Sequence, residues 1–111
     1  MEIAEQKYGA VTVVRPVGPL VQPAADELLD RMQKLRTASL GRLVLDGSGI
    51  AYVDSRGLEV LVEIAAALQR GGQGLKICGA NEILREVFEL TELTQVFEHF
   101  VDVNTAVRSF L

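Results

Sequence analysis

The strongest constraint on the fold is a strand, helix, strand series in the middle of the chain. Arg42 to Asp46 holds a compact apolar run between glycines, as expected of a strand buried on both faces. A long helical pattern runs from Ser55 to about Arg70 and ends at Gly71-Gly72, where helices often stop. Leu75 to Cys78 is the next apolar strand. Because short connections of this kind join parallel strands through a right-handed crossover, we predict an α/β protein.

Weaker patterns continue the series on both sides of this unit. The β-branched run within Met1 to Val17 predicts an opening hairpin, and apolar residues at helical spacing predict a helix from about Pro23 to Thr37. Three elements are predicted after Cys78: a helix capped by Asn81, a short strand near Val96 to Phe100, and a helix opened by Asn104 with Val107, Phe110 and Leu111 against the core. We therefore predict one domain over residues 1–111, with a single mixed sheet of about four to five strands and about four helices.

Composition narrows the function classes. With 111 residues, of which 49% are apolar, the chain is long enough for one cored domain and too short for two. The formal net charge is -4 and the Lys and Arg residues are scattered singly, which disfavours nucleic-acid binding. No apolar stretch approaches the length of a membrane span or a signal peptide, so we expect a cytoplasmic protein without membrane insertion.

Few residues could carry catalytic chemistry. The single cysteine, Cys78, supplies no disulfide, metal or redox pair and is expected to be a small core residue. The single histidine, His99, has no visible Ser-His-Asp set around it. We therefore expect no metal, no cofactor and no catalytic residue, and a protein that acts by binding other proteins and not as an enzyme.

The most informative stretch joins the end of the central strand to the start of the longest helix. Residues Gly47 to Val53 are predicted to form a loop at the edge where open α/β sheets usually place their sites. Unpaired backbone N–H groups at the start of the following helix favour an anion. We expect this loop to be supported by Asp46, Ser48 and Gly49.

The polar residues at the start of this helix, Asp54 and Ser55, could have a structural or a functional role. Asp54 or Ser55 is explained structurally as an N-cap, which is the usual role of such residues. The neighbouring residues favour a functional role, because glycines at positions 47, 49 and 57 allow close backbone approach and two carboxylates bracket the loop.

Two motifs in this stretch resemble the phosphorylation loop of the STAS domain family, the anti-sigma factor antagonists. The chain reads Asp-Ser-x-Gly-Leu at residues 54–58, after a strand that ends in Asp-x-Ser-Gly at residues 46–49. The predicted order of strands and helices is also similar to that family over essentially the whole chain. The resemblance implies a STAS-like fold.

The resemblance also implies a function. In such proteins the serine that matches Ser55 is phosphorylated by the partner, an anti-sigma factor that is also a serine kinase, and a serine phosphatase reverses the change. The unphosphorylated antagonist binds the anti-sigma factor and frees the sigma factor. By this resemblance, Asp54 matters for kinase recognition, Gly57 and Leu58 seat the helix, and phosphorylation at Ser55 switches the protein off.

Two positions depart from the family pattern and bear on which partner is bound. The residue after the serine is often a second small hydroxyl residue, and here it is Arg56, which we expect to neutralise part of a phosphate on Ser55. The first loop often carries an acidic residue after its Gly-x-Leu, and here Gly18-Pro19-Leu20 is followed by Val21-Gln22.

The helix that follows Ser55 is apolar on two nearly opposite sides. At about 100° per residue, one stripe contains Leu58, Leu61, Val62, Ala65 and Leu68, and the other contains Val60, Ile64 and Ala67. A neighbouring helix could cover the second stripe. Our hypothesis is that it is partly exposed and docks the partner, together with the residues at the helix start. The predicted partner-binding residues are Asp54, Ser55, Arg56, Gly57, Leu58, Val60, Ile64 and Ala67.

Two other functions are compatible with the sequence. The same fold could serve without phosphorylation as a scaffold, or as the accessory STAS subunit of a transport system. A small nucleotide could bind at the same helix start, although no Lys or Thr anchor is present there. Modification of Ser55 by a cognate kinase distinguishes the first function from these two.

Overall fold

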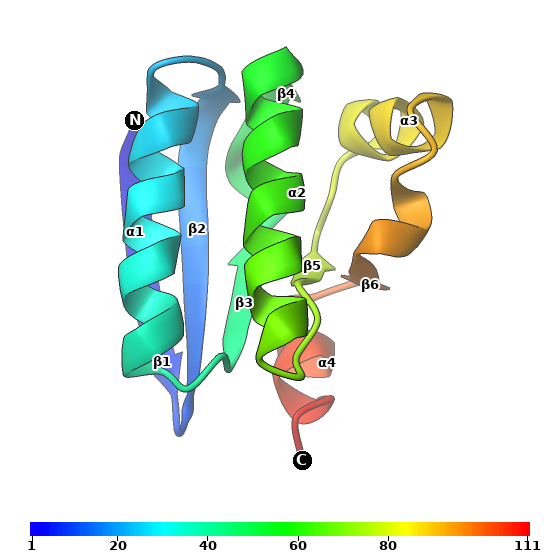
Figure 1. The fold of residues 1–111 in the computed structure, drawn as a ribbon. Helices are drawn as coiled ribbons and strands as arrows, with labels where there is room; N and C mark the ends of the chain where they lie inside the picture. Colours follow the sequence, from blue (N-terminus) through cyan, green and yellow to red (C-terminus); the bar gives the residue numbers. More distant parts are fainter.

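The computed structural model describes residues 1–111, and its helices lie against one sheet (Figure 1). The strands are β1 (Glu2–Tyr8), β2 (Val11–Leu20), β3 (Leu43–Asp46), β4 (Ile50–Val53), β5 (Lys76–Cys78) and β6 (Glu98–Phe100). The α-helices are α1 (Ala24–Ala38), α2 (Ser55–Arg70), α3 (Glu82–Leu90) and α4 (Val103–Arg108). Two short 3-10 helices are η1 (Gly47–Gly49) and η2 (Thr94–Val96).

The sheet is mixed, as predicted. Its strand order is β1-β2-β3-β5-β6, and β4 pairs with β2 outside this path. β1 and β2 form the predicted antiparallel hairpin, whereas the pairs β2–β3, β3–β5 and β5–β6 are all parallel. The apolar run of β3 therefore lies in the centre of the sheet, which confirms the prediction that this strand is buried on both faces.

Two apolar clusters hold the helices to the two faces of the sheet. Successive residues of β3 point to opposite faces, so Leu45 belongs to the larger cluster and Val44 to the smaller one. The larger cluster joins the sheet to α1, α2 and α3, and α1 and α2 lie side by side over it (Figure 1). The smaller cluster contains Cys78 and Ala106 and joins the sheet to α4. None of the helices is both long and apolar enough to cross a membrane.

The prediction of a loop from Gly47 to Val53 is wrong. The segment contains η1 followed by β4, and β4 runs parallel to the end of β2, with Gly18 opposite Ile50 and Leu20 opposite Val53. Ile50, Tyr52 and Val53 are residue types that favour strands, but the run is short and its pairing partner lies about 30 residues earlier in the chain, so the sequence did not show that it joins the sheet. The effect of β4 is to carry the chain from the centre of the sheet to the start of α2.

The elements after β5 are close to their predicted positions. Asn81 caps α3 as predicted, because its side chain accepts a hydrogen bond from the Leu84 N–H at 2.8 Å. The last helix begins at Val103, not at Asn104, because Asp102 is its N-cap and accepts from the Thr105 N–H at 2.8 Å.

The predicted packing of the last helix is correct in part. Val107 and Phe110 are half-buried against the smaller cluster, as predicted. Leu111 was placed against the core and is fully exposed, because α4 has already ended at Arg108.

Candidate functional site

The turn that follows β3 is held by side chains predicted to support it. The Asp46 carboxylate accepts a hydrogen bond from the Ser48 N–H at 3.0 Å, which closes η1. Arg15 on β2 donates from Nε to the Ser48 hydroxyl at 3.3 Å and lies 3.8 Å from Asp46 Oδ2. The turn is thus fixed both to the end of β3 and to β2.

Two glycines let the following segment approach the backbone of β2. A Cβ atom on Gly49 would lie 2.6 Å from the Pro16 carbonyl oxygen, and one on Gly57 would lie 2.2 Å from the Leu20 carbonyl oxygen. Real Cβ atoms do not come this close to backbone atoms, so only glycine fits at either position. The first turn of α2 is therefore pressed directly onto the end of β2.

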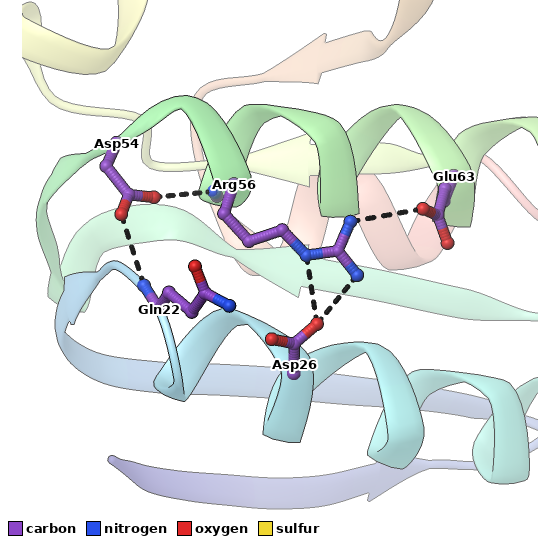
Figure 2. A network of polar contacts seen from close by, with 6 residues as sticks. Gln22, Asp26, Asp54, Arg56 and Glu63 are labelled. Atoms are coloured by element: carbon purple, nitrogen blue, oxygen red, sulfur yellow. Dashed lines mark hydrogen bonds and ion pairs between the residues drawn. The ribbon is translucent and has the colours of Figure 1, made fainter.

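Asp54 is the N-cap of α2, and both of its carboxylate oxygens are occupied. Oδ1 accepts from the Gly57 N–H at 2.8 Å, and Oδ2 accepts from the Gln22 N–H at 3.2 Å (Figure 2). These backbone hydrogen bonds, that of Gly57 first, hold the pKa of the Asp54 carboxyl below its ordinary value. Asp54 therefore caps the helix and also ties it to the segment before α1.

Ser55 is the first residue of α2 and is exposed, as the proposed modification requires. The side chains of its two neighbours, Asp54 and Arg56, form hydrogen bonds with other groups and none with the Ser55 hydroxyl. The hydroxyl thus lies in solvent at a helix N-terminus, where the helix dipole favours an added negative charge.

The Arg56 side chain points toward α1, which differs from the expectation that it neutralises a phosphate on Ser55. Its Nε and Nη2 donate to Asp26 Oδ1 at 2.9 and 2.6 Å, and its Nη1 donates to Glu63 Oε1 at 3.3 Å (Figure 2). The hydrogen bond to Asp26 raises the pKa of the Arg56 guanidinium above its ordinary value. The charge of Arg56 is therefore already engaged by two carboxylates.

The expectation that the second apolar stripe of α2 is partly exposed is wrong. Val60, Ile64 and Ala67 are only 0%, 3% and 3% exposed. The physical reason is that α1 packs beside α2 and covers this side, with Leu28 and Met32 in the same apolar cluster as Val60 and Ile64. These three residues hold α2 to the rest of the fold and present no surface to a partner.

The apolar surface of α2 that remains accessible is on its other side. A groove there is lined by Leu58, Glu59, Val62 and Glu63 of α2 and by Leu93, which follows α3. Leu58 and Val62 are half-buried, so each shows part of its side chain in the groove. Leu58 was predicted to bind a partner, whereas Val62 was assigned only to the first apolar stripe of α2, and the sequence gave no reason to single out Leu93.

The structure offers no evident centre for a metal or for thiol chemistry. No group of three or more His, Cys, Asp or Glu side chains is arranged to hold a metal ion. Cys78 is fully buried, as predicted, and burial raises the pKa of its thiol to about 11.

Comparison with known protein families identifies the STAS domain in this chain. A model of the STAS domain matches residues 2–106 of the chain. The fold is similar to that of an anti-sigma factor antagonist from Mycobacterium paratuberculosis, with a TM-score of 0.85 and 21% sequence identity, over 97% of this chain and 92% of that chain.

Two further solved structures share the fold. The Bacillus cell fate determinant SpoIIAA in its phosphorylated form gives a TM-score of 0.73 and 13% identity, over 99% of this chain and 100% of that chain. The murine Solute Carrier 26 family member A9 anion transporter in the inward-facing state gives 0.70 and 19%, over 95% of this chain but only 18% of that chain. At these identities each likeness is one of fold.

Proposed function

Since this chain belongs to the STAS domain family, we propose that it is an anti-sigma factor antagonist controlled by phosphorylation of Ser55. In its unphosphorylated form it binds a cognate anti-sigma factor with serine kinase activity, and that partner phosphorylates it. A serine phosphatase restores the binding form. The protein works in the cytoplasm, catalyses no reaction itself and takes part in transcription regulation through its partner alone.

The observation that carries this proposal is the exposed hydroxyl of Ser55 at the first residue of α2. A kinase needs a hydroxyl that its active site can reach, and the neighbouring side chains leave this one free. SpoIIAA, which shares the fold, has a structure in a phosphorylated form, and the proposal agrees with this likeness of fold. A transport accessory role rests on fold likeness alone and no observation at the site favours it.

The docking surface combines the start of α2 with the groove beside it. Ser55 and Leu58 are one turn apart on the same side of α2. The exposed Ser55 therefore lies next to the groove that is lined by Leu58, Val62 and Leu93. The occupant is a segment of the anti-sigma factor that places apolar side chains in the groove while its kinase site reaches Ser55. Val60, Ile64 and Ala67 have no part in this surface.

Phosphorylation switches the surface off by electrostatic repulsion and not by unfolding. A phosphate adds about 1.5 to 2 negative charges at neutral pH, and the N-terminus of a helix tolerates them. Against a partner carboxylate at roughly 5 Å, a dianion costs about 2 kcal/mol in water and about 6 to 7 kcal/mol at an effective dielectric of 20. Either cost lowers the affinity by at least about tenfold.

The proposal is tested by incubating the protein with purified anti-sigma factor kinases from the genome that encodes this chain and with ATP, then locating phosphate by mass spectrometry. Ser55→Ala is expected to bind a kinase and accept no phosphate, and Ser55→Asp is expected to bind more weakly. Ser109→Ala is the matched control, since Ser109 is an exposed serine at the end of α4, a helix that packs on the opposite face of the sheet from α2. Absence of modification together with normal binding by Ser55→Asp would eliminate the switch.

A further inference from the structure

Arg56 is the side chain through which the start of α2 is joined to the first turn of α1. Its guanidinium bonds Asp26 on α1 through Nε and Nη2 and bonds Glu63 on α2 through Nη1 (Figure 2). The planar guanidinium can hold both carboxylates because its donors point in several directions. A lysine ammonium at the end of its stem cannot reproduce this geometry.

Asp54 makes a second connection between the same two segments. Its carboxylate accepts from the backbone N–H of Gln22, just before α1, and from that of Gly57 in α2. The residues on both sides of Ser55 are therefore tied to the segment from Gln22 to Asp26. Ser55 lies between the two connections, and its hydroxyl takes part in neither.

These contacts hold the first turn of α1 in position but add little to the stability of the fold. Partly exposed ion pairs contribute little to the stability of a fold, because water screens them and they restrict flexible side chains. The Arg56 network nevertheless fixes the first turn of α1 in one position relative to Ser55. A surface that is ordered before a partner arrives loses less conformational freedom on binding, and the complex is correspondingly tighter.

We propose that Arg56 is a positioning residue that makes the first turn of α1 and the phosphorylatable turn of α2 one partner-binding surface, an inference that rests on the proposed function. The anti-sigma factor then contacts the start of both helices. Loss of either Arg56 or Asp26 loosens the start of α1, which then keeps only the hydrogen bond from the Gln22 N–H to Asp54 as a polar contact with the start of α2. The partner must restore the lost order on binding, so the complex is weaker.

The test is a double-mutant cycle between Arg56→Gln and Asp26→Asn. Affinity for the anti-sigma factor kinase that binds the wild-type chain is measured by titration calorimetry. Each single variant is expected to bind about 3- to 10-fold more weakly, and the double variant no more weakly than the weaker single variant. Asp30→Asn is the matched control, because Asp30 lies one turn further along α1 and pairs with Lys34; it should bind within about twofold of wild type.

Hydrogen exchange of the free protein provides a readout that requires no partner. The amides of Asp26 and Glu27 donate to the Pro23 carbonyl in the first turn of α1. They are expected to exchange faster in Arg56→Gln and in Asp26→Asn and at the wild-type rate in Asp30→Asn.

The outcomes separate this inference from the proposed function. Unchanged affinity in both single variants, or losses that simply add in the double variant, overturns the positioning role of Arg56 and leaves the proposed function intact. Unchanged exchange in the first turn of α1 overturns it as well. A wild-type chain that binds none of the kinases overturns the proposed function and this inference together.

Discussion

Gly57 lies so close to Leu20 that the backbone carbonyl of Leu20 leaves no room for a Cβ atom on Gly57. A Cβ on Gly57 would stand 2.2 Å from the Leu20 carbonyl oxygen and 3.2 Å from its carbonyl carbon. Because both groups belong to backbone, neither can move aside as a flexible side chain would. This contact sets how deeply the first turn of α2, with Ser55 on it, sits against the end of β2.

Gly57→Ala is therefore expected to destabilise the protein, by about 1 to 3 kcal/mol or more, since the helix start must shift away from β2. Urea unfolding followed by circular dichroism measures the change. Gly71→Ala is the control, because a Cβ there meets only the Leu68 carbonyl oxygen at 3.5 Å, an ordinary contact. Equal stability of the two variants would contradict the close packing at Gly57.

The Asp54 carboxyl group makes the stability of the protein depend on pH in the acidic range. The pKa of its carboxyl is lowered in the folded state by the hydrogen bonds from Gly57 and Gln22, so the folded state favours the ionised form. The stabilisation is present above the ordinary pKa of aspartate and is lost as the pH falls through the lower folded-state value. Asp54→Asn is therefore expected to show a smaller fall in melting temperature than wild type between about pH 5 and pH 2.

A comparison with Asp102 sharpens this measurement. Asp102 caps α4, and the hydrogen bond from the Thr105 N–H likewise lowers the pKa of its carboxyl. Asp102→Asn is expected to reduce the acid dependence of stability in the same direction without changing the affinity for an anti-sigma factor. Acid profiles of Asp54→Asn and wild type that run parallel would rule out the assigned role of the Asp54 carboxylate.

Elements with local signals at both ends could be predicted from the sequence. The bounds of α2, Ser55–Arg70, agree with the prediction because Asp54 caps one end and Gly71 follows the other. β4 could not be predicted in this way, because it exists only through its pairing with β2, where Gly18 stands opposite Ile50. Its sequence alone carries no sign of that distant partner.

The same distinction applies to the candidate site. Asp54 and Ser55 could be singled out because both belong to one short motif at a helix start. The partners that fix the site, Gln22 for Asp54 and Asp26 for Arg56, lie 32 and 30 residues away in the chain. A helical wheel showed that α2 has two apolar sides but could not show that α1 covers the one with Ile64.

The burial of the second stripe and the exposure of the groove predict opposite behaviour for two apolar residues of α2. Ile64→Ala removes a core side chain and is expected to cost about 2 to 4 kcal/mol of stability, while the fraction that remains folded binds the partner normally. Leu58→Ala is expected to cost about 1 kcal/mol or less but to weaken binding about tenfold.

Urea unfolding and titration calorimetry with the anti-sigma factor kinase measure the two effects separately for Ile64→Ala and Leu58→Ala. Binding is compared at a temperature where both variants are fully folded, so that loss of stability does not imitate loss of affinity. A folded Ile64→Ala that binds poorly, beside a Leu58→Ala that binds well, would return the docking surface to the stripe that α1 covers.

Cys78 is expected to be inert in the folded protein. Its side chain is fully buried between the sheet and α4, and burial raises the pKa of the thiol to about 11, so almost no thiolate exists at pH 8. Ellman's reagent at pH 8 should therefore react with native protein only as fast as it unfolds, and with urea-unfolded protein within minutes. Rapid reaction of the native protein would mean that α4 opens readily from the sheet and exposes the smaller cluster.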